Sequence, residues 1–270
     1  RLEGLSGFAA RLSLLLERIV CASATSVVCV SPSLKEVARS MRLTSTERLI
    51  VLGSGSSNGV DTQAFCPANA AQRVAARQQF GIPDDVFVVG FAGRLTHDKG
   101  LPWLFKAIGE VAKSRPKVRL LIAGSAVSES RDHPEVPSTA PWIHVLGQVK
   151  DMPNYYRALD VFCLPSLREG FPNATLEALA TGIPVITSNA TGCIDSVQAG
   201  KTGLVVPTRD ATALAHAIEM LMDRGDLREK MGREGRTQVL NHWRNRDVWL
   251  RTSALLAESI TLSDKKAFLR

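Results

Sequence analysis

The fold of this chain is decided by the stretch Asp160-Val-Phe-Cys-Leu-Pro-Ser-Leu-Arg-Glu-Gly-Phe-Pro-Asn-Ala-Thr-Leu-Glu-Ala-Leu-Ala-Thr-Gly-Ile-Pro184. Residues 161–164 form a short apolar run that a proline closes, which predicts a buried strand of a parallel sheet. Pro172 and Asn173 mark the start of a helix, because a proline in the first turn loses no hydrogen bond. Gly182 ends this helix. The stretch therefore predicts a strand, a loop and a helix in succession.

Two glutamates flank the start of this predicted helix. Glu169 lies in the loop at the carboxyl end of the strand, and Glu177 lies ~7 Å along the helix. A helix N-terminus favours phosphate, and in an open α/β sheet ligands bind at this edge. We therefore expect the two carboxylates to hold hydroxyl groups on either side of a phosphate. The alternative is that Glu177 is merely favoured near a helix start, with Glu169 a solvated loop charge.

Four motifs in this chain resemble those of one enzyme family. The run from Glu169 to Glu177, two glutamates separated by seven residues, is similar to the signature of the retaining glycosyltransferases of family 4 (group 1), which have the glycosyltransferase B fold. The other three motifs occur in the family's order and are Asn58-Gly-Val-Asp61, Gly93-Arg-Leu95 with Lys99-Gly100, and Gly203-Leu-Val-Val-Pro207. Together the four span most of the sequence.

The pattern from residue 86 onward alternates between strands and helices. Such alternation predicts an α/β fold with a doubly wound parallel sheet, and three helical segments follow at 211–260. The resemblance implies that this is the Rossmann-like C-terminal half of a glycosyltransferase B fold, with C-terminal helices. We expect four parts: 1–52 as the tail of an incomplete N-terminal acceptor domain, 53–85 as an interdomain connector, 86–240 as the nucleotide-sugar-binding domain, and 241–270 as a C-terminal helix and tail.

Arg94 and Lys99 follow the first predicted strand of this domain. Side chains at the carboxyl end of a strand reach the ligand crevice, and two cations there would offset the charge of a diphosphate. Isolated loop charges are otherwise solvated. The resemblance implies that both clamp the donor phosphates. Negative charge gathers on the leaving diphosphate as the sugar departs, so fixed cations would lower the barrier.

The resemblance also assigns roles to individual residues. It implies that Glu169, Arg94 and Lys99 are catalytic, that Glu169 contacts hydroxyls of the transferred sugar, and that Glu177 holds the ribose. Val149 belongs to a loop that would read the nucleotide base. The implied donor-binding residues are Arg94, Lys99, Gly170, Phe171, Pro172, Asn173, Ala174, Glu177 and Val149.

No metal or other cofactor is expected, and the nucleotide-diphosphate sugar is a substrate. The sequence has no Asp-x-Asp among its apolar strands and no His or Cys cluster at metal-ligand spacing. Five cysteines at irregular spacing predict free thiols in a reducing compartment. No apolar run reaches the ~18 residues that a membrane-crossing helix needs.

The formal net charge is +7 and 45% of the residues are hydrophobic. The basic residues are dispersed and aromatic residues make up only 6%, so a nucleic-acid partner is not expected. We expect a cytoplasmic protein at the inner face of the membrane. Leu5, Phe8 and Ile19 belong to an apolar stripe at helical spacing, which predicts a helix that either packs on its own domain or lies on a membrane surface.

We expect a hexosyltransferase that moves a sugar from a UDP-sugar to a hydroxyl of a polyprenyl-linked or other saccharide acceptor in surface polysaccharide synthesis. The chain starts at Arg1 rather than Met, so we expect a piece of a longer protein, and a donor-binding module inactive as this piece is an alternative. A paired-carboxylate glycosidase is a second alternative. A dinucleotide-binding oxidoreductase is a third, against which the spacing of Gly53, Gly55 and Gly59 argues.

Overall fold

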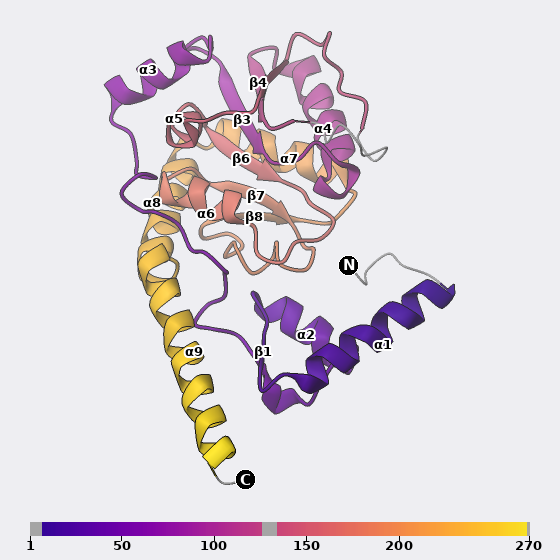
Figure 1. The fold of residues 1–270 in the computed structure, drawn as a ribbon. Coiled ribbons are helices and arrows are strands. Elements are labelled where there is room, and N and C mark those ends of the chain that lie inside the picture. Colours follow the sequence, from indigo (N-terminus) through magenta and orange to yellow (C-terminus); the bar gives the residue numbers. More distant parts are fainter. Residues whose placement is uncertain (1–6, 126–133, 269–270) are drawn as a thin grey trace.

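A six-stranded parallel sheet forms the centre of the protein (Figure 1). The computed structural model describes residues 7–125 and 134–268, with side chains up to residue 260. The strands are β3 Phe87–Ala92, β4 Val118–Ala123, β5 Ile143–Gly147, β6 Val161–Leu164, β7 Val185–Ser188 and β8 Gly203–Val206. Their spatial order is β5-β4-β3-β6-β7-β8. The chain therefore runs outward from β3 in one direction and then, from β6, in the other, which confirms the predicted doubly wound α/β fold.

Helices cover both faces of this sheet (Figure 1). The pair α4 Leu101–Ser114 and α7 Ala211–Asp223 pack on each other on one face. The other face carries α3 Ala70–Gln79, α5 Met152–Arg157, α6 Asn173–Ala180 and α8 Gly225–His242, which contact one another in the pairs α3–α5, α5–α6 and α6–α8. Because both faces are covered, all four residues of β6 and of β7 are buried.

The predicted strand and helix of the deciding stretch are confirmed by β6 and α6. Pro172 occupies the N-cap of α6, one position before the first helical turn. Gly100, which precedes α4, has a φ of 77°, and a Cβ on it would lie 2.0 Å from the carbonyl oxygen of Pro165. A side chain at this position would therefore push the loop after β3 away from the loop after β6.

Residues 7–50 form a smaller unit beside the large sheet (Figure 1). It consists of α1 Gly7–Ser23, β1 Val27–Val28, α2 Pro32–Ser40, a short 3-10 helix Thr46–Arg48 and β2 Leu49–Ile50, with β1 and β2 paired in parallel. Its buried apolar cluster consists of Cys29, Ala38 and Leu49. We call this the N-terminal unit.

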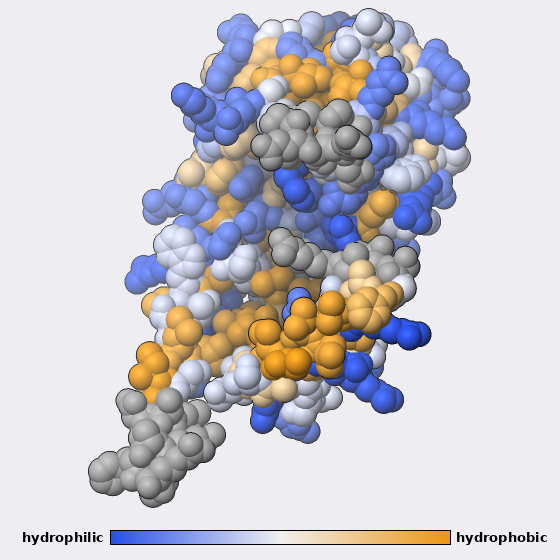
Figure 2. All heavy atoms as spheres, turned by 45° about the vertical axis from the view of Figure 1, so that its right-hand side comes forward, coloured by the Kyte–Doolittle hydropathy of each residue, from blue (hydrophilic) through white to orange (hydrophobic). Residues whose placement is uncertain are grey.

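The apolar stripe predicted for the first helix is present but uncovered in α1. The exposed fraction is 82% for Phe8 and 54% for Leu16. Figure 2 shows the resulting apolar patch on the surface. No other described element packs over this face, so the predicted packing on its own domain is not observed, and Leu5 lies outside the described residues.

Residues 51–86 connect the N-terminal unit to the first strand of the large sheet. The loop containing Gly53, Gly55 and Gly59 opens no helix, which agrees with the argument against a dinucleotide loop. A helix that the sequence analysis did not predict, α3, follows in this stretch, and its Arg77 pairs with Asp160 at 2.8 Å beside the large sheet. The last helix, α9 Asn245–Phe268, runs from the large sheet past the N-terminal unit (Figure 1). The predicted domain boundaries stay a prediction.

Candidate functional site

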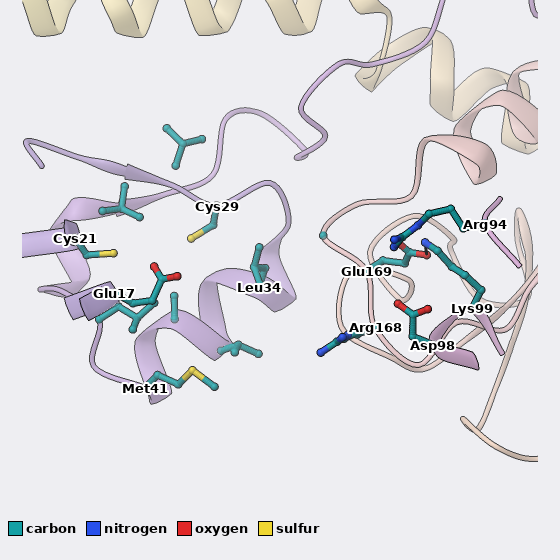
Figure 3. Close-up of a pocket in the computed structure, with 16 residues that line it drawn as sticks. Glu17, Cys21, Cys29, Leu34, Met41, Arg94, Asp98, Lys99, Arg168 and Glu169 are labelled. Carbon is teal, nitrogen blue, oxygen red and sulfur yellow. Dashed lines mark hydrogen bonds and ion pairs between the residues drawn. The ribbon is translucent and has the colours of Figure 1, made fainter. Parts of the chain in front are cut away.

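A pocket of about 570 Å³ lies between the N-terminal unit and the loops that follow β3 and β6 (Figure 3). One wall is polar and contains Arg94, Asp98, Lys99, Arg168, Glu169 and Gly170. The other wall comes from α1, β1, α2 and the turn after α2, and consists of Glu17, Cys21, Val27, Val28, Cys29, Leu34, Val37, Ala38, Met41 and Leu43. The pocket therefore opens at the carboxyl ends of β3 and β6, where the strand order reverses and ligands of such sheets bind.

The polar wall brings together the three residues predicted to be catalytic. Figure 3 shows the charged ends of Arg94, Lys99 and Glu169 close to one another. Lys99 Nζ donates to Glu169 Oε1 at 2.6 Å, and the two side chains are only 16% and 13% exposed. The ammonium keeps two further N–H donors for a ligand. Arg94 is an exposed residue, and it has no ion-pair partner among residues 7–125 and 134–260.

Hydrogen bonds fix the loop that carries Glu169. Its own N–H donates to Thr191 O at 2.9 Å, and its carboxylate accepts from Ser166 Oγ at 2.8 Å. Leu167 N donates to Asp98 O at 2.7 Å, which ties this loop to the one after β3. Gly192 has a φ of 76°, and a Cβ there would lie 2.4 Å from Glu169 O. The loop that carries Glu169 is therefore fixed between two neighbouring segments, which contain Asp98 and Gly192.

Glu177 lies on α6 and faces α5. Its Oε2 accepts a hydrogen bond from the Tyr156 hydroxyl at 2.8 Å. Burial raises the pKa of Glu177, and the hydrogen bond from Tyr156 opposes that rise. Glu177 does not line the pocket described above, so the two signature glutamates have different partners and different surroundings.

The remaining predicted donor-binding residues surround the start of α6 or follow β5. The ring of Phe171 packs on Trp243, with ring centroids 5.6 Å apart, so its side chain belongs to the core and only its backbone is available to a ligand. Asn173 Oδ1 is buried without a hydrogen-bond partner. Ala174 and Val149 pack partly buried against the core, and Pro172 O accepts from Thr175 Oγ1 at 2.7 Å. The donor-contact roles of these residues stay predictions.

Several residues of this region were not predicted from the sequence. Asp98 and Arg168 line the pocket, and Tyr156 holds Glu177. Ser33 of α2 reaches the large sheet, where its Oγ contacts the carboxylate of Asp195 and accepts from Gly192 N at 2.8 Å. The order of residues along the chain gives no sign of these pairings, because the partners of Ser33 are about 160 residues away.

No group of three or more His, Cys, Asp or Glu side chains suited to a metal ion occurs within the part of the chain that the structure describes. The expectation that no metal or cofactor is needed stays a prediction. Within that same part, no helix has the length and apolar character needed to span a membrane.

The family was identified by comparison with known proteins. Residues 86–224 match the family model for glycosyl transferases group 1. The chain belongs to the group 1 glycosyltransferases. This confirms the family inferred from the four sequence motifs, and the matched residues contain both Arg94 and the two signature glutamates.

Relatives of this group 1 glycosyltransferase include the capsular polysaccharide biosynthesis glycosyltransferase CapM of Staphylococcus aureus. It is 34% identical over 252 residues, which are 92% of this chain and 66% of CapM. A GDP-mannose-dependent monoacylated phosphatidylinositol monomannoside mannosyltransferase of Corynebacterium glutamicum is 33% identical over 69% of this chain and 51% of its own length. The chain thus spans less than two thirds of the length of these relatives.

Solved structures share its fold. Sucrose-phosphate synthase of Thermosynechococcus elongatus superposes with a TM-score of 0.82 at 25% identity, over 96% of this chain and 65% of the synthase. Anabaena HepE in complex with UDP and glucose gives a TM-score of 0.81 at 20% identity, over 92% of this chain and 67% of HepE. These likenesses confirm the Rossmann-like α/β architecture.

Proposed function

We propose that this chain contains the donor-binding part of a retaining glycosyltransferase that moves a hexose from a nucleotide-diphosphate sugar to an acceptor hydroxyl. The observation that carries the proposal is the convergence of Arg94, Lys99 and Glu169 on one pocket at the switch point of the sheet. Two cations and a carboxylate are the groups needed beside a diphosphate joined to a hydroxylated sugar. In this proposal, residues 86–240 bind the donor, and residues 1–52 belong to the acceptor side.

The proposed chemistry is electrostatic. As the bond from the sugar carbon to the phosphate oxygen breaks, negative charge gathers on the leaving diphosphate. Arg94 and Lys99 take up this charge, together with the backbone N–H groups at the start of α6. Glu169 orients the sugar hydroxyls while its own position is fixed by Lys99 and Ser166. No metal ion takes part in this scheme.

UDP is the nucleotide that we propose for the donor. HepE, which shares the fold, was solved with UDP and glucose, whereas the relative from Corynebacterium glutamicum is named for GDP-mannose. GDP is therefore the competing candidate. The acceptor that we propose is a lipid-linked saccharide of surface polysaccharide synthesis, at the inner face of the cytoplasmic membrane. The similarity to CapM and the net charge of +7 support this choice.

Isothermal titration calorimetry with UDP, GDP and ADP tests the proposal. The wild-type chain should bind UDP, and Arg94→Ala and Lys99→Ala should each weaken binding by roughly tenfold or more, because a hydrogen bond to a charged group contributes about 1.5–3 kcal/mol. Lys113→Ala is the matched control, since its ammonium pairs with Glu110 on the exposed side of α4. Absence of nucleotide binding, or equal affinities in all three variants, would refute the site.

A second candidate function is a nucleotide-sugar-binding module that does not transfer sugar by itself. The uncovered apolar face of α1 favours it, because an acceptor-side unit with so few buried residues is incompletely packed. A transfer assay with UDP-glucose and a polyprenyl-linked saccharide separates the two candidates. Donor binding without transfer by this chain supports the module, and transfer by this chain supports the complete enzyme.

A further inference from the structure

Tyr156 occupies a rigid position in the core beside Glu177. Its side chain is fully buried, with three aromatic neighbours packed against it at an angle. The ring centroids lie 5.3 Å from Tyr155, 5.5 Å from Phe162 and 5.9 Å from Phe65. This packing fixes the direction in which the hydroxyl points, which is toward Glu177 Oε2 at 2.8 Å. The hydroxyl is therefore a fixed hydrogen-bonding group aimed at one carboxylate oxygen.

In the hydrogen bond between Tyr156 and Glu177, the phenol is always the donor. Burial and the neighbouring charge of Glu177 raise the pKa of Tyr156 well above its ordinary value, so the phenol stays protonated and donates. Oε2 of Glu177 must accept. Burial raises the pKa of this carboxylate, and the hydrogen bond from Tyr156 lowers it. The second oxygen, Oε1, has no hydrogen-bond partner among residues 7–125 and 134–260.

We propose that Tyr156 is a positioning residue for nucleotide binding, which holds Oε2 of Glu177 so that Oε1 accepts hydrogen bonds from the paired hydroxyls of the donor's ribose. The inference rests on the proposed function, because it requires a ribonucleotide at this site. A glutamate side chain has three rotatable bonds, so an unheld carboxylate would lose conformational entropy on binding. The fixed phenol removes that cost before the ligand arrives. It also favours the ionised carboxylate, which is the form that accepts from both hydroxyls.

The chain supplies a matched control in the preceding residue. Tyr155 is equally buried on the same helix, but its single hydroxyl hydrogen is shared between Phe91 O at 2.7 Å and Leu121 O at 2.9 Å. Tyr155→Phe and Tyr156→Phe remove the same atom from the same helix. Only the second substitution removes a hydrogen bond from Glu177.

Calorimetry with paired ligands tests the proposal. UDP, GDP or ADP, whichever the wild-type chain binds most tightly, is compared with its 2′,3′-dideoxy counterpart, with far-UV circular dichroism as the check that each variant is folded. Tyr156→Phe should weaken binding of the ribonucleotide about tenfold and that of the dideoxynucleotide less than twofold. Tyr155→Phe should change the two affinities by the same factor.

The pH dependence gives a readout that a purely structural role would not change. Loss of the hydrogen bond from Tyr156 raises the pKa of Glu177 further, so more of the carboxylate is protonated at a given pH. As the pH falls, Tyr156→Phe should therefore lose ribonucleotide affinity at a higher pH than the wild type and Tyr155→Phe do. The dideoxynucleotide should show no such displacement between variants.

Two results would overturn the inference while leaving the proposed function standing. These are nucleotide binding by the wild type with equal losses in both tyrosine variants, and a Tyr156→Phe loss that is the same for ribo- and dideoxynucleotide. If the wild-type chain binds none of the three nucleotides, the proposed function fails and this inference fails with it.

Discussion

The large sheet and the N-terminal unit contain the same kinds of elements but differ in how completely those elements are covered. Every residue of β6 is buried, whereas β1 has a half-buried and an exposed residue. The large sheet has helices on both faces, and the buried cluster of the N-terminal unit contains only three residues. Parallel strands bury both of their faces when helices cover them. Strands and helices alone are therefore not sufficient for a core, because their apolar faces must also be covered.

The two walls of the candidate site come from these two differently covered units. The polar wall belongs to the large sheet, where hydrogen bonds tie the loop of Glu169 to neighbouring loops. The apolar wall belongs to the N-terminal unit, which contacts the large sheet through Ser33, Asp195 and Gly192. We therefore expect the donor-binding groups to keep their geometry even when the N-terminal unit is perturbed.

The largest effect should come from the ion-pair network that holds α3 on the large sheet. Asp160 pairs with Arg73 at 2.7 Å and Arg77 at 2.8 Å, and it accepts from Val88 N at 2.7 Å. Asp160→Ala leaves the buried charge of Arg77 unpaired, so the free energy of unfolding should fall by about 3–5 kcal/mol. Urea unfolding followed by circular dichroism measures the loss.

Asp223→Ala is the control for this measurement. Asp223 pairs with Arg115 on the surface, where the two side chains are 55% and 44% exposed, so its removal should cost less than about 1 kcal/mol. Equal losses for the two aspartates would show that the network around Asp160 contributes nothing beyond a surface pair.

A pair of leucines tests the difference in coverage directly. Leu120 of β4 is fully buried, and Leu120→Ala should lower the free energy of unfolding by about 2–5 kcal/mol through the lost contacts and the cavity left behind. Leu16 of α1 is 54% exposed, and Leu16→Ala should change it by less than about 0.5 kcal/mol. A loss above 1 kcal/mol for Leu16→Ala would mean that its face is covered in solution.

The smallest expected effect is a difference in thiol reactivity. Cys21 and Cys29 of the N-terminal unit, and Cys163 and Cys193 of the large sheet, are all buried. Burial raises the pKa of all four, that of Cys193 to about 11. If the N-terminal unit opens locally, its two cysteines should be alkylated roughly tenfold faster at pH 8.

Mass spectrometry of peptides from timed alkylation with iodoacetamide measures the four rates. Cys66, which is only half-buried, gives the reference for an accessible thiol in the same sample. Equal rates at the four buried cysteines would contradict separate opening and show that the two units unfold together.

Local signals in the sequence predicted most of the large sheet. The apolar run of β6 and the proline before α6 are each visible within a few residues, and the alternation of strands and helices extends from β3 to β8. One such signal was overlooked: Asn69 and Gln72 form a capping box at the start of α3, and this spacing is visible in the sequence. The short length of β1 and β2 was not predictable, because the length of a strand depends on the neighbouring strands with which it pairs.

From the sequence alone it could be predicted that Arg94, Lys99 and Glu169 lie at one edge of the sheet, because parallel strands joined by crossover helices place all their following loops on one side. The contacts that each of these side chains makes became visible in the folded chain. Lys99 pairs with Glu169, 70 positions away, Glu177 is held by Tyr156, and the ring of Phe171 turns to Trp243. Such pairings depend on side-chain directions and packing between distant segments, which residue order and periodicity do not encode.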